Sequence, residues 1–269
     1  MSLFKLIILP FLLTILNSDQ YTLYKSIPVS EVQYFTTDNL GNTYYIENNV
    51  LSKVNSYDGK TYTFSEKNIG HLSMIDATNA LKLLLLYPDF NIIKVLDSKL
   101  APTTTLDLRQ INIFQPRLVT NSYNDCIWIY DQQDFHLKRI NPSLQIVNES
   151  PNIKQLLNLD LKPNYLLENN KWLYLNDPSN GIIIFDFFGT YYKTLPIKGL
   201  KSFQIIGDEL IYFSREDSAL SFKRYNLNTQ TEKEILLPEI QTKDSLLDAR
   251  LAQGKLFLFK KELIDLYTF

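Results

Sequence analysis

Acidic side chains follow several apolar stretches of this sequence at regular intervals. Together with one arginine they form the set Asp89, Asp134, Asp177, Arg215, Glu216 and Asp217. Carboxylate oxygens are the ligands that hard divalent cations prefer, so a converging group could hold such a cation or bind a polar ligand. The same residues suit tight turns, as in Asp177-Pro178-Ser179-Asn180, and turn formation is the reading that the pattern favours.

Other residues that could do chemistry are scarce. His71 and His136 fall in different predicted strands, so we predict a structural or surface role for each and no shared metal ion. Cys126 is the one cysteine and begins the apolar stretch CIWIY, which predicts a buried thiol and excludes an intrachain disulfide. GxSxG, P-loop and GxGxxG motifs are missing from the sequence. We therefore assign no catalytic residue, no metal ligand and no cofactor.

One predicted turn carries aromatic residues where polar ones are expected. It reads DFFGTYY over 186–192, and we predict that Phe187, Phe188 and Tyr191 are exposed at the edge of the molecule. Phe114 is a further exposed candidate. Exposed apolar side chains that gather in a patch often mark a contact with another protein. We therefore take the three turn residues as a second candidate binding site.

The charge balance excludes one class of partner. The chain has 27 Lys and Arg residues against 29 Asp and Glu residues, for a formal net charge of -2. Broad electrostatic capture of nucleic acid needs a basic surface, and the short basic pairs Lys138-Arg139 and Lys223-Arg224 do not supply one. The 17 Tyr and 16 Phe residues argue against disorder and predict a large packed core.

These side chains must be positioned by a repeat of short strands. A turn rich in Asn, Asp or Gly precedes a strand of aromatic and branched residues six times, at Asn42–Glu47, Leu81–Tyr87, Cys126–Asp131, Lys171–Asn176, Glu209–Ser214 and Lys255–Lys260. Near-continuous apolarity indicates burial on both faces, as in a strand between two neighbouring sheets. Equivalent positions recur every 38 to 46 residues or so, about the length of one four-stranded propeller blade. The sequence predicts an all-β, six-bladed β-propeller with four antiparallel strands in each blade.

The ends of the chain predict how this ring closes. The sixth repeat ends at Phe269 after its third strand, whereas Tyr21–Pro28 forms a strand to spare before the first repeat. If that strand joins the last blade, the ring is sealed and few strand edges stay open. A single stretch, Asn152–Leu161, favours a helix.

The first twenty residues resemble a secretory signal peptide. Lys5 precedes the apolar run Leu6–Leu16, and polar residues follow it. The run is too short to span a bilayer, which needs about twenty residues, and no later stretch is longer. We predict a signal peptide over 1–20, a propeller domain over 21–269, and an exported protein of the periplasm or outer cell envelope. Abundant Lys, Asn and Ile favour a bacterial source.

The first repeat resembles blades of a known group. Thr36–Asn55 contains D-x-x-G-N-x-Y-Y followed by alternating apolar residues, and is similar to blades of NHL-like and TolB-like six-bladed propellers. The tryptophan-aspartate pair of WD40 blades and the YWTD tetrapeptide are absent from the sequence. Members of the resembled group include sugar lactonases, peptide-binding scaffolds and envelope assembly factors, so the resemblance implies a fold and several functions.

These observations favour a non-catalytic binding or scaffold module. We expect it to bind a protein partner in the bacterial cell envelope, without spanning the membrane and without binding nucleic acid. A monomer within a larger complex, such as one at the outer membrane, is the arrangement we expect. The alternative is a metal-dependent hydrolase of the sugar-lactonase type. That alternative requires Asp, Glu and Asn side chains to converge at the mouth of the central channel.

Overall fold

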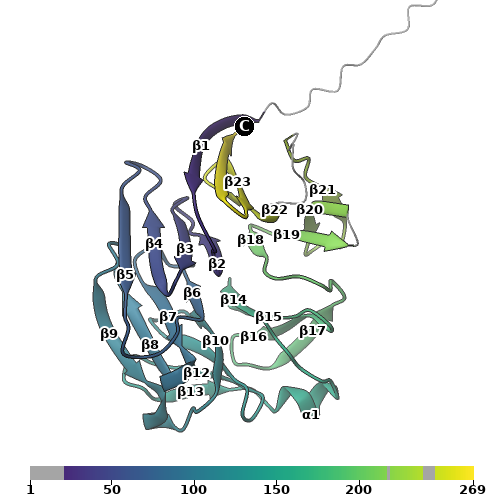
Figure 1. Ribbon diagram of the computed structural model, residues 1–269. Helices are drawn as coiled ribbons and strands as arrows, with labels where there is room; N and C mark the ends of the chain where they lie inside the picture. Colours follow the sequence, from purple (N-terminus) through teal and green to yellow (C-terminus); the bar gives the residue numbers. More distant parts are fainter. Residues whose placement is uncertain (1–20, 217–218, 239–245) are drawn as a thin grey trace, which may run out of the picture.

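The fold is a ring of six separate sheets. A computed structural model describes residues 21–216, 219–238 and 246–269 and shows six four-stranded antiparallel sheets around a centre (Figure 1). The predicted signal peptide (1–20), the side chain of Glu216 and the residue Asp217 lie outside the described part. The predicted all-β, six-bladed propeller is confirmed.

Each blade runs from an inner to an outer strand in chain order. Blades one to three are β2 (Tyr34–Thr37), β3 (Thr43–Glu47), β4 (Val50–Val54), β5 (Thr61–Ser65); β6 (Met74–Asp76), β7 (Leu83–Tyr87), β8 (Ile92–Leu96), β9 (Pro102–Asp107); and β10 (Pro116–Asn121), β11 (Ile127–Asp131), β12 (His136–Ile140), β13 (Ile146–Glu149). Blades four to six are β14 (Tyr165–Asn169), β15 (Trp172–Asp177), β16 (Gly181–Asp186), β17 (Tyr191–Leu195); β18 (Gln204–Ile206), β19 (Glu209–Glu216), β20 (Ala219–Asn226), β21 (Glu232–Glu234); and β22 (Leu246–Ala252), β23 (Lys255–Lys260), β24 (Leu263–Thr268), β1 (Thr22–Pro28). The one α-helix of the described residues, α1 (Ile153–Leu157), lies in the stretch predicted to be helical.

Burial falls from the second strand of a blade to the fourth. All five residues of β7 are fully buried, whereas β5 alternates between exposed and half-buried side chains. The second strand has a neighbouring blade on each face, so both sets of alternate side chains pack in apolar layers. Trp128 and Tyr130 on β11 are fully buried in the largest of these layers. Cys126 is also buried, as predicted.

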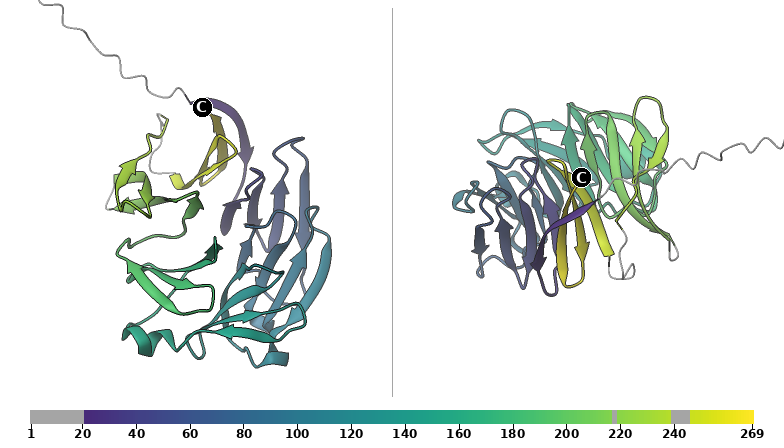
Figure 2. Two further views of the ribbon diagram at one scale, coloured as in Figure 1. Left: turned by 180° about the vertical axis from the view of Figure 1, so that it is seen from behind. Right: turned by 90° about the horizontal axis from the view of Figure 1, so that it is seen from above.

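The N-terminal strand closes the ring. β1 pairs antiparallel with β24, from Thr22 opposite Thr268 to Pro28 opposite Leu263, and supplies the missing outer strand of blade six. Figure 2 shows β1 lying beside the C-terminal hairpin, with both ends of the described chain close together. Closure pairs the outer edge of β24, which would otherwise be exposed to other chains. The predicted closure is therefore confirmed.

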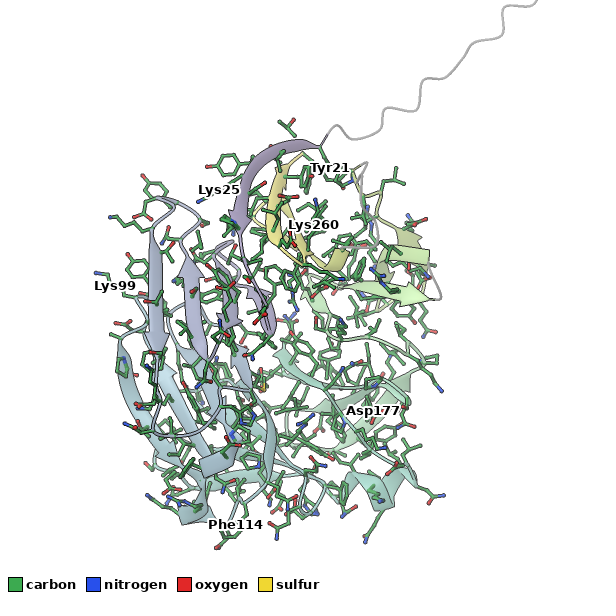
Figure 3. All side chains as sticks on the ribbon, in the orientation of Figure 1. Tyr21, Lys25, Lys99, Phe114, Asp177 and Lys260 are labelled. Carbon is green, nitrogen blue, oxygen red and sulfur yellow. The ribbon has the colours of Figure 1, made fainter. Side chains whose placement is uncertain are left out.

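The alternation of strands gives the ring two different faces. Turns between first and second strands and between third and fourth strands lie on one side, which we call the turn face. Loops between second and third strands and the links between blades lie on the other side, which we call the link face. In Figure 3, Lys99, from a turn-face turn, lies at the left edge of the molecule, and Phe114, from a link, lies at the bottom. The candidate sites below are assigned to one face or the other.

An Asn or Asp starts the turn after the third strand in five blades. Its side-chain oxygen accepts hydrogen bonds from backbone N–H groups two to four residues further on, and the residues are Asn55, Asp97, Asn141, Asp186 and Asn226. Such Asx turns fix the local chain without help from distant residues. They hold the turn face in a defined shape.

Candidate functional site

A cavity of about 450 Å³ lies at the centre of the ring. The inner strands of blades one, two, four, five and six line it. The lining reaches from Tyr34 and Tyr165 on the strands to Asn39, Asn169 and Gln253 in the turns that follow them. The lining therefore runs along the inner strands as far as the turn face.

The D-x-x-G-N motif of blade one forms part of the cavity wall. Asp38 is 3% exposed and its Oδ1 accepts hydrogen bonds from the backbone N–H groups of Leu40 and Asn42, both at 2.9 Å. Its Oδ2 accepts from Asn42 Nδ2 at 2.7 Å and from the Tyr44 hydroxyl at 2.8 Å. Burial first, and the Asp38 charge second, raise the pKa of the Tyr44 phenol. The motif therefore fixes a turn at the mouth of the cavity.

Two further acidic residues line the cavity, from blades two and four. Asp76 is buried, and its Oδ2 accepts from the backbone N–H and side-chain amide of Asn121 at 2.5 and 2.9 Å. Glu168 is half-buried and accepts from Ser122 Oγ at 2.5 Å and from the Tyr123 N–H at 3.2 Å. These bonds tie blade three to blades two and four. In the described residues, neither Asp76 nor Glu168 has a cationic side chain within ion-pair distance.

The floor of the cavity carries a buried guanidinium. Arg250 is 3% exposed, donates to Ser202 Oγ at 2.6 Å, and its Nε lies 3.6 Å from Asp248 Oδ2. Burial disfavours the charged form of Arg250 and lowers its pKa. The nearby Asp248, Tyr165 and Tyr34 together raise the pKa by more, so it lies above the ordinary value of arginine. Burial also raises the pKa of Tyr34 and Tyr165, so both phenols remain protonated. Sequence patterns did not single out any of these residues.

The acidic residues predicted as a link-face site bind separate partners. Asp177 is fully buried, and its carboxylate accepts from the N–H groups of Ser179, Asn180 and Lys162. Asp89 contacts His71, with 2.6 Å between Asp89 Oδ2 and His71 Nδ1. In Figure 3, Asp177 lies within blade four, where it closes the turn before β16. For these residues the structure shows turn-forming contacts.

The remaining predicted link-face residues lie further along the ring. Asp134 contacts Lys138, and Arg215 is exposed and donates to the Leu246 carbonyl oxygen at 2.6 Å. The side chain of Glu216 is outside the described part. Within the described ranges, these side chains bond to separate groups and form no common cluster.

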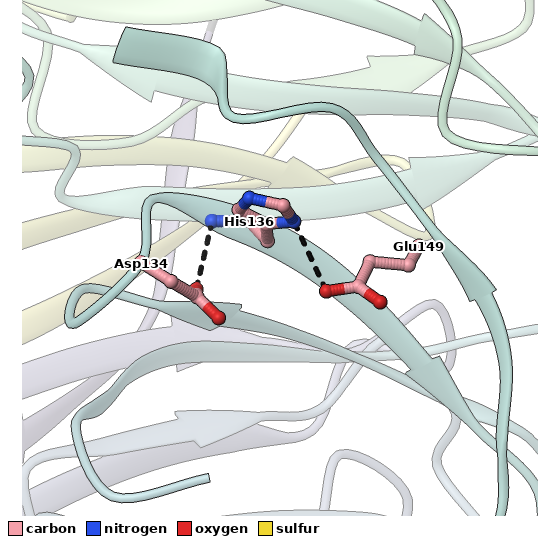
Figure 4. A group of neighbouring side chains, drawn as sticks. All are labelled: Asp134, His136 and Glu149. Carbon is pink, nitrogen blue, oxygen red and sulfur yellow. Dashed lines mark hydrogen bonds and ion pairs between the residues drawn. The ribbon is translucent and has the colours of Figure 1, made fainter. Parts of the chain in front are cut away.

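One trio of possible metal ligands occurs in the described residues. Ligand atoms of Asp134, His136 and Glu149 lie within 4.8 Å of one another on blade three, and His136 Nδ1 is 3.0 Å from Glu149 Oε1 (Figure 4). Lys138 already provides a cation there, because its ammonium contacts Asp134 and lies 2.9 Å from Asp131 Oδ2. Burial opposes the Lys138 charge, but hydrogen bonds to both carboxylates outweigh it and raise the Lys138 pKa. The trio lies on the outer half of the blade, away from the cavity.

We expect Asp89 to contribute its full stabilisation of the fold above about pH 4 and to lose it as the pH falls further. The His71 backbone N–H first, and its ring second, hold the pKa of Asp89 below its ordinary value. A carboxylate whose pKa falls on folding contributes stability above its unfolded pKa, and that contribution is lost as pH falls through the folded value. The urea midpoint of wild type should exceed that of Asp89→Asn near neutrality, and the difference should vanish in acid. A difference that is the same at every pH would contradict this assignment.

A patch of aromatic side chains lies on the turn face of blades three and four. Phe188 is 64% exposed and packs edge to face on Phe187, with ring centres 5.4 Å apart. Phe187 in turn contacts Tyr123 at 6.5 Å, and the Arg139 guanidinium lies 4.3 Å from the centre of the Phe187 ring. Arg139 also donates to the Tyr123 carbonyl oxygen within blade three, so its contact with the Phe187 ring joins blade three to blade four.

A second aromatic pair lies at the turn-face end of blade four, on the side of its sheet that faces blade five. Trp172 and Tyr192 have ring centres 4.8 Å apart, and Tyr192 is 58% exposed. Tyr191, which the sequence placed on the surface, is half-buried against Phe185, while its neighbour Tyr192 points outward. Alternation along β17 explains the difference, because successive side chains of a strand point to opposite faces. We call Tyr123, Phe187, Phe188, Trp172 and Tyr192 the aromatic patch.

Comparisons with known proteins find similarity in the fold. A catalytically inactive virginiamycin B lyase from Staphylococcus aureus with quinupristin is 15% identical, with TM-score 0.62, covering 93% of this chain and 100% of that one. BamB from Moraxella catarrhalis is 10% identical, with TM-score 0.53, covering 93% and 100%. An extracellular domain from B. thetaiotaomicron is 10% identical, with TM-score 0.53, covering 87% of this chain and 32% of that one. No family model and no curated protein matches the sequence.

The shared feature is the propeller. The similarity supports the predicted propeller fold. At these identities the likeness carries no substrate or partner to this chain. In the described part of the propeller, no helix is long and apolar enough to cross a membrane.

Proposed function

We propose that this propeller is an exported, non-catalytic binding module that holds a protein partner in the bacterial cell envelope. The observation that carries the proposal is the aromatic patch on the turn face. Three of its rings, Tyr123, Phe188 and Tyr192, are each more than half exposed. Exposed aromatic side chains that gather on one face are characteristic of protein interfaces, since they bury a large area at a small entropic cost.

The patch is also held in place before any partner binds. Phe187 is packed between Arg139 and Tyr123, and the Phe188 backbone N–H donates to Asp186 Oδ1 at 2.9 Å. Lys171 lies 5.9 Å from the centre of the Tyr123 ring. Preorganised side chains lose little freedom on binding, which favours a stable complex.

Two further observations support the proposed setting. Residues 1–20 have the layout of a signal peptide, and one protein of similar fold is an extracellular domain. The hydrolase alternative has less support. Among described residues, the carboxylates of the central cavity do not bring three ligand atoms within 4.8 Å of one another. We infer that the cavity is not arranged as a catalytic metal site.

We expect the double variant Phe188→Ser, Tyr192→Ser to lose the partner while remaining folded. Both rings are largely exposed, so their removal should change the free energy of unfolding by less than about 1 kcal/mol. The measurement is a crosslinked affinity purification of tagged protein from cell envelopes, with recovered proteins identified by mass spectrometry. A partner recovered in stoichiometric amounts with wild type should fall at least about tenfold with the variant.

The matched control removes aromatic residues from the opposite face. Phe90 is 45% exposed and Phe114 is 47% exposed, and both lie on the link face. Phe90→Ser, Phe114→Ser should retain the partner. Equal loss in both double variants would show nonspecific adhesion, and loss only in the control would place the binding surface on the link face.

A further inference from the structure

A groove of about 250 Å³ lies between blade six and blade one, and we call it the seam groove because the ring closes there. Its lining comes from β1 and β24 on one side and from β4 and the turn-face residues 55–59 on the other. Ile27, Val54 and Leu266 are buried beneath it. The open surface of the groove is therefore mainly polar and aromatic.

Two exposed tyrosines line the seam groove from opposite sides. Tyr57, from blade one, is 96% exposed, and Tyr24, from β1, is 58% exposed. Among the described residues, the Tyr57 side chain makes no ring contact and no hydrogen bond. An exposed tyrosine offers an apolar ring face together with a polar hydroxyl, a combination suited to wet binding sites. The carbon-hydrogen faces of sugar rings stack on such ring faces.

The turn that carries Tyr57 is fixed before any ligand binds. Asn55 Oδ1 accepts from the Tyr57 backbone N–H at 2.8 Å, and the Asn55 carbonyl oxygen accepts from the Gly59 N–H at 3.0 Å. Gly59 supplies the positive φ of +69° that the turn requires. A ring on a fixed turn loses little freedom when a ligand stacks on it.

Two lysines give the groove a positive charge. Lys25 lines it, and a Cβ built on Gly59 would lie 3.2 Å from Lys25 Nζ, so the ammonium reaches across to blade one. In Figure 3, Lys25 lies on the side of β1 that faces blade one. Lys255 Nζ lies 4.7 Å from the centre of the Tyr24 ring. Neither lysine has an ion-pair partner among the described residues.

The carboxylates close to the groove are already paired. Asp58 is the one carboxylate among the described lining residues, and its Oδ2 lies 3.2 Å from Lys60 Nζ. Asp265 on β24 is paired with Lys260. The charges of Lys25 and Lys255 are therefore free to attract an anionic ligand, and complementary charge favours both its capture and its orientation.

We propose that the seam groove binds an acidic oligosaccharide. Its sugar rings stack on Tyr57 and Tyr24, and its carboxylate or phosphate groups pair with Lys25 and Lys255. Asn55 Nδ2, which donates to no other described residue, can donate to a sugar hydroxyl. An acidic peptide fits less well, because the apolar lining is buried and leaves no pocket for an apolar anchor. The proposal does not rest on the aromatic patch, since the seam groove lies between other blades.

Calorimetric titration of the purified protein at low ionic strength tests the proposal. Trigalacturonate should bind at least about fivefold more tightly than its neutral methyl ester, which keeps the rings and lacks the charges. Triaspartate with blocked ends carries the charges without sugar rings and should bind less tightly than trigalacturonate. Maltotriose phosphate identifies the acidic group: tighter binding than trigalacturonate indicates a phosphorylated glycan, and weaker binding indicates a uronic acid glycan.

Two variants with matched controls separate the contributions of charge and stacking. Lys25→Met keeps the alkyl chain and should weaken trigalacturonate about fivefold while leaving the methyl ester unchanged. Tyr57→Ala should weaken both sugars at least about threefold without lowering Tm, because the ring is almost fully exposed. Lys99→Met changes an exposed lysine in the corresponding turn of blade two, and Phe188→Ser changes the aromatic patch. Neither control should alter sugar binding.

Four results would overturn the proposal. Trigalacturonate and its methyl ester could bind equally well, or Tyr57→Ala could keep wild-type affinity for both. Equal losses in Lys25→Met and Lys99→Met would show a general attraction of charge without a site. Triaspartate binding as tightly as trigalacturonate would assign the groove to an acidic peptide instead. Partner recovery from cell envelopes is a separate measurement, so either proposal can fail while the other stands.

Discussion

Replacing Asp38 with alanine should destabilise the propeller by about 3 to 5 kcal/mol. The carboxylate accepts four hydrogen bonds in a nearly closed site, so its removal leaves the N–H groups of Leu40 and Asn42, the Asn42 amide and the Tyr44 hydroxyl without their acceptor. Urea unfolding followed by tryptophan fluorescence measures the effect, because Trp128 is fully buried in the described structure.

A matched substitution separates this effect from a general loss of charge. Asp58 lies in a turn of the same blade, where its Oδ1 accepts from the Lys60 N–H, and Asp58→Ala should cost less than about 1 kcal/mol. Tyr44→Phe added to Asp38→Ala removes one unsatisfied donor, so the double variant should lose less stability than the two single variants together. A cost below about 1 kcal/mol for Asp38→Ala would show that water replaces the carboxylate.

Replacing Gly181 with alanine should cost about 3 to 4 kcal/mol. Gly181 has φ +105° at the start of β16, and a Cβ there would lie 2.3 Å from the Leu195 carbonyl oxygen. That oxygen belongs to the outer strand β17, which pairs with β16, so relief requires the two strands to separate. Thermal or urea unfolding of the variant gives the cost directly.

Gly207 provides the control for the backbone effect alone. It has φ +60° in a turn-face turn, and a Cβ there would meet nothing within 4 Å. Gly207→Ala should therefore cost only about 1 kcal/mol. Equal costs at the two positions would mean that the strained φ, and not the contact with Leu195, limits substitution.

Much of the fold could be predicted because second and third strands carry strong patterns. β7 and β23 read as apolar runs, and their predicted ranges, Leu81–Tyr87 and Lys255–Lys260, differ from the observed strands by two residues at most. Burial between two blades permits little besides apolar residues, so composition alone marks these strands. The closing strand β1 was predicted by counting strands. The sixth repeat has three strands in place of four, and one additional strand precedes the first repeat.

The residues that line the central cavity were not predicted, because inner strands carry weak patterns. β6 and β18 have three residues each, too few for periodicity to distinguish a strand from a loop. In the sequence, Arg250 and Asp76 therefore look like ordinary charged residues. Both come to line the central cavity because successive blades are rotated around one axis. The link-face acids stood in the predicted loops, but sequence spacing could not show that His71, Lys138 and backbone N–H groups already bind them.

The aromatic patch was predicted in part. Phe187 and Phe188 were recognised because two rings in a tight turn break the usual polar composition. Tyr123 comes from blade three, and only the packing of blade three against blade four brings it to Phe187, whereas Trp172 meets Tyr192 within blade four through the sheet pairing.

The pairing of β1 with β24 also determines when the molecule can become complete. Thr22 and Thr268 are opposite each other, so the last contact joins nearly the two ends of the described chain. Closing so long a loop is slow, and the outer edge of β24 stays open until it happens. During synthesis, blades one to five can form as soon as their strands have been made. Blade six can form only after the last strand, β24, has been made and released. During that interval an extended segment of another chain could pair with the open edge of β24 in place of β1. The late pairing of β1 with β24 is therefore the step at which folding competes with aggregation.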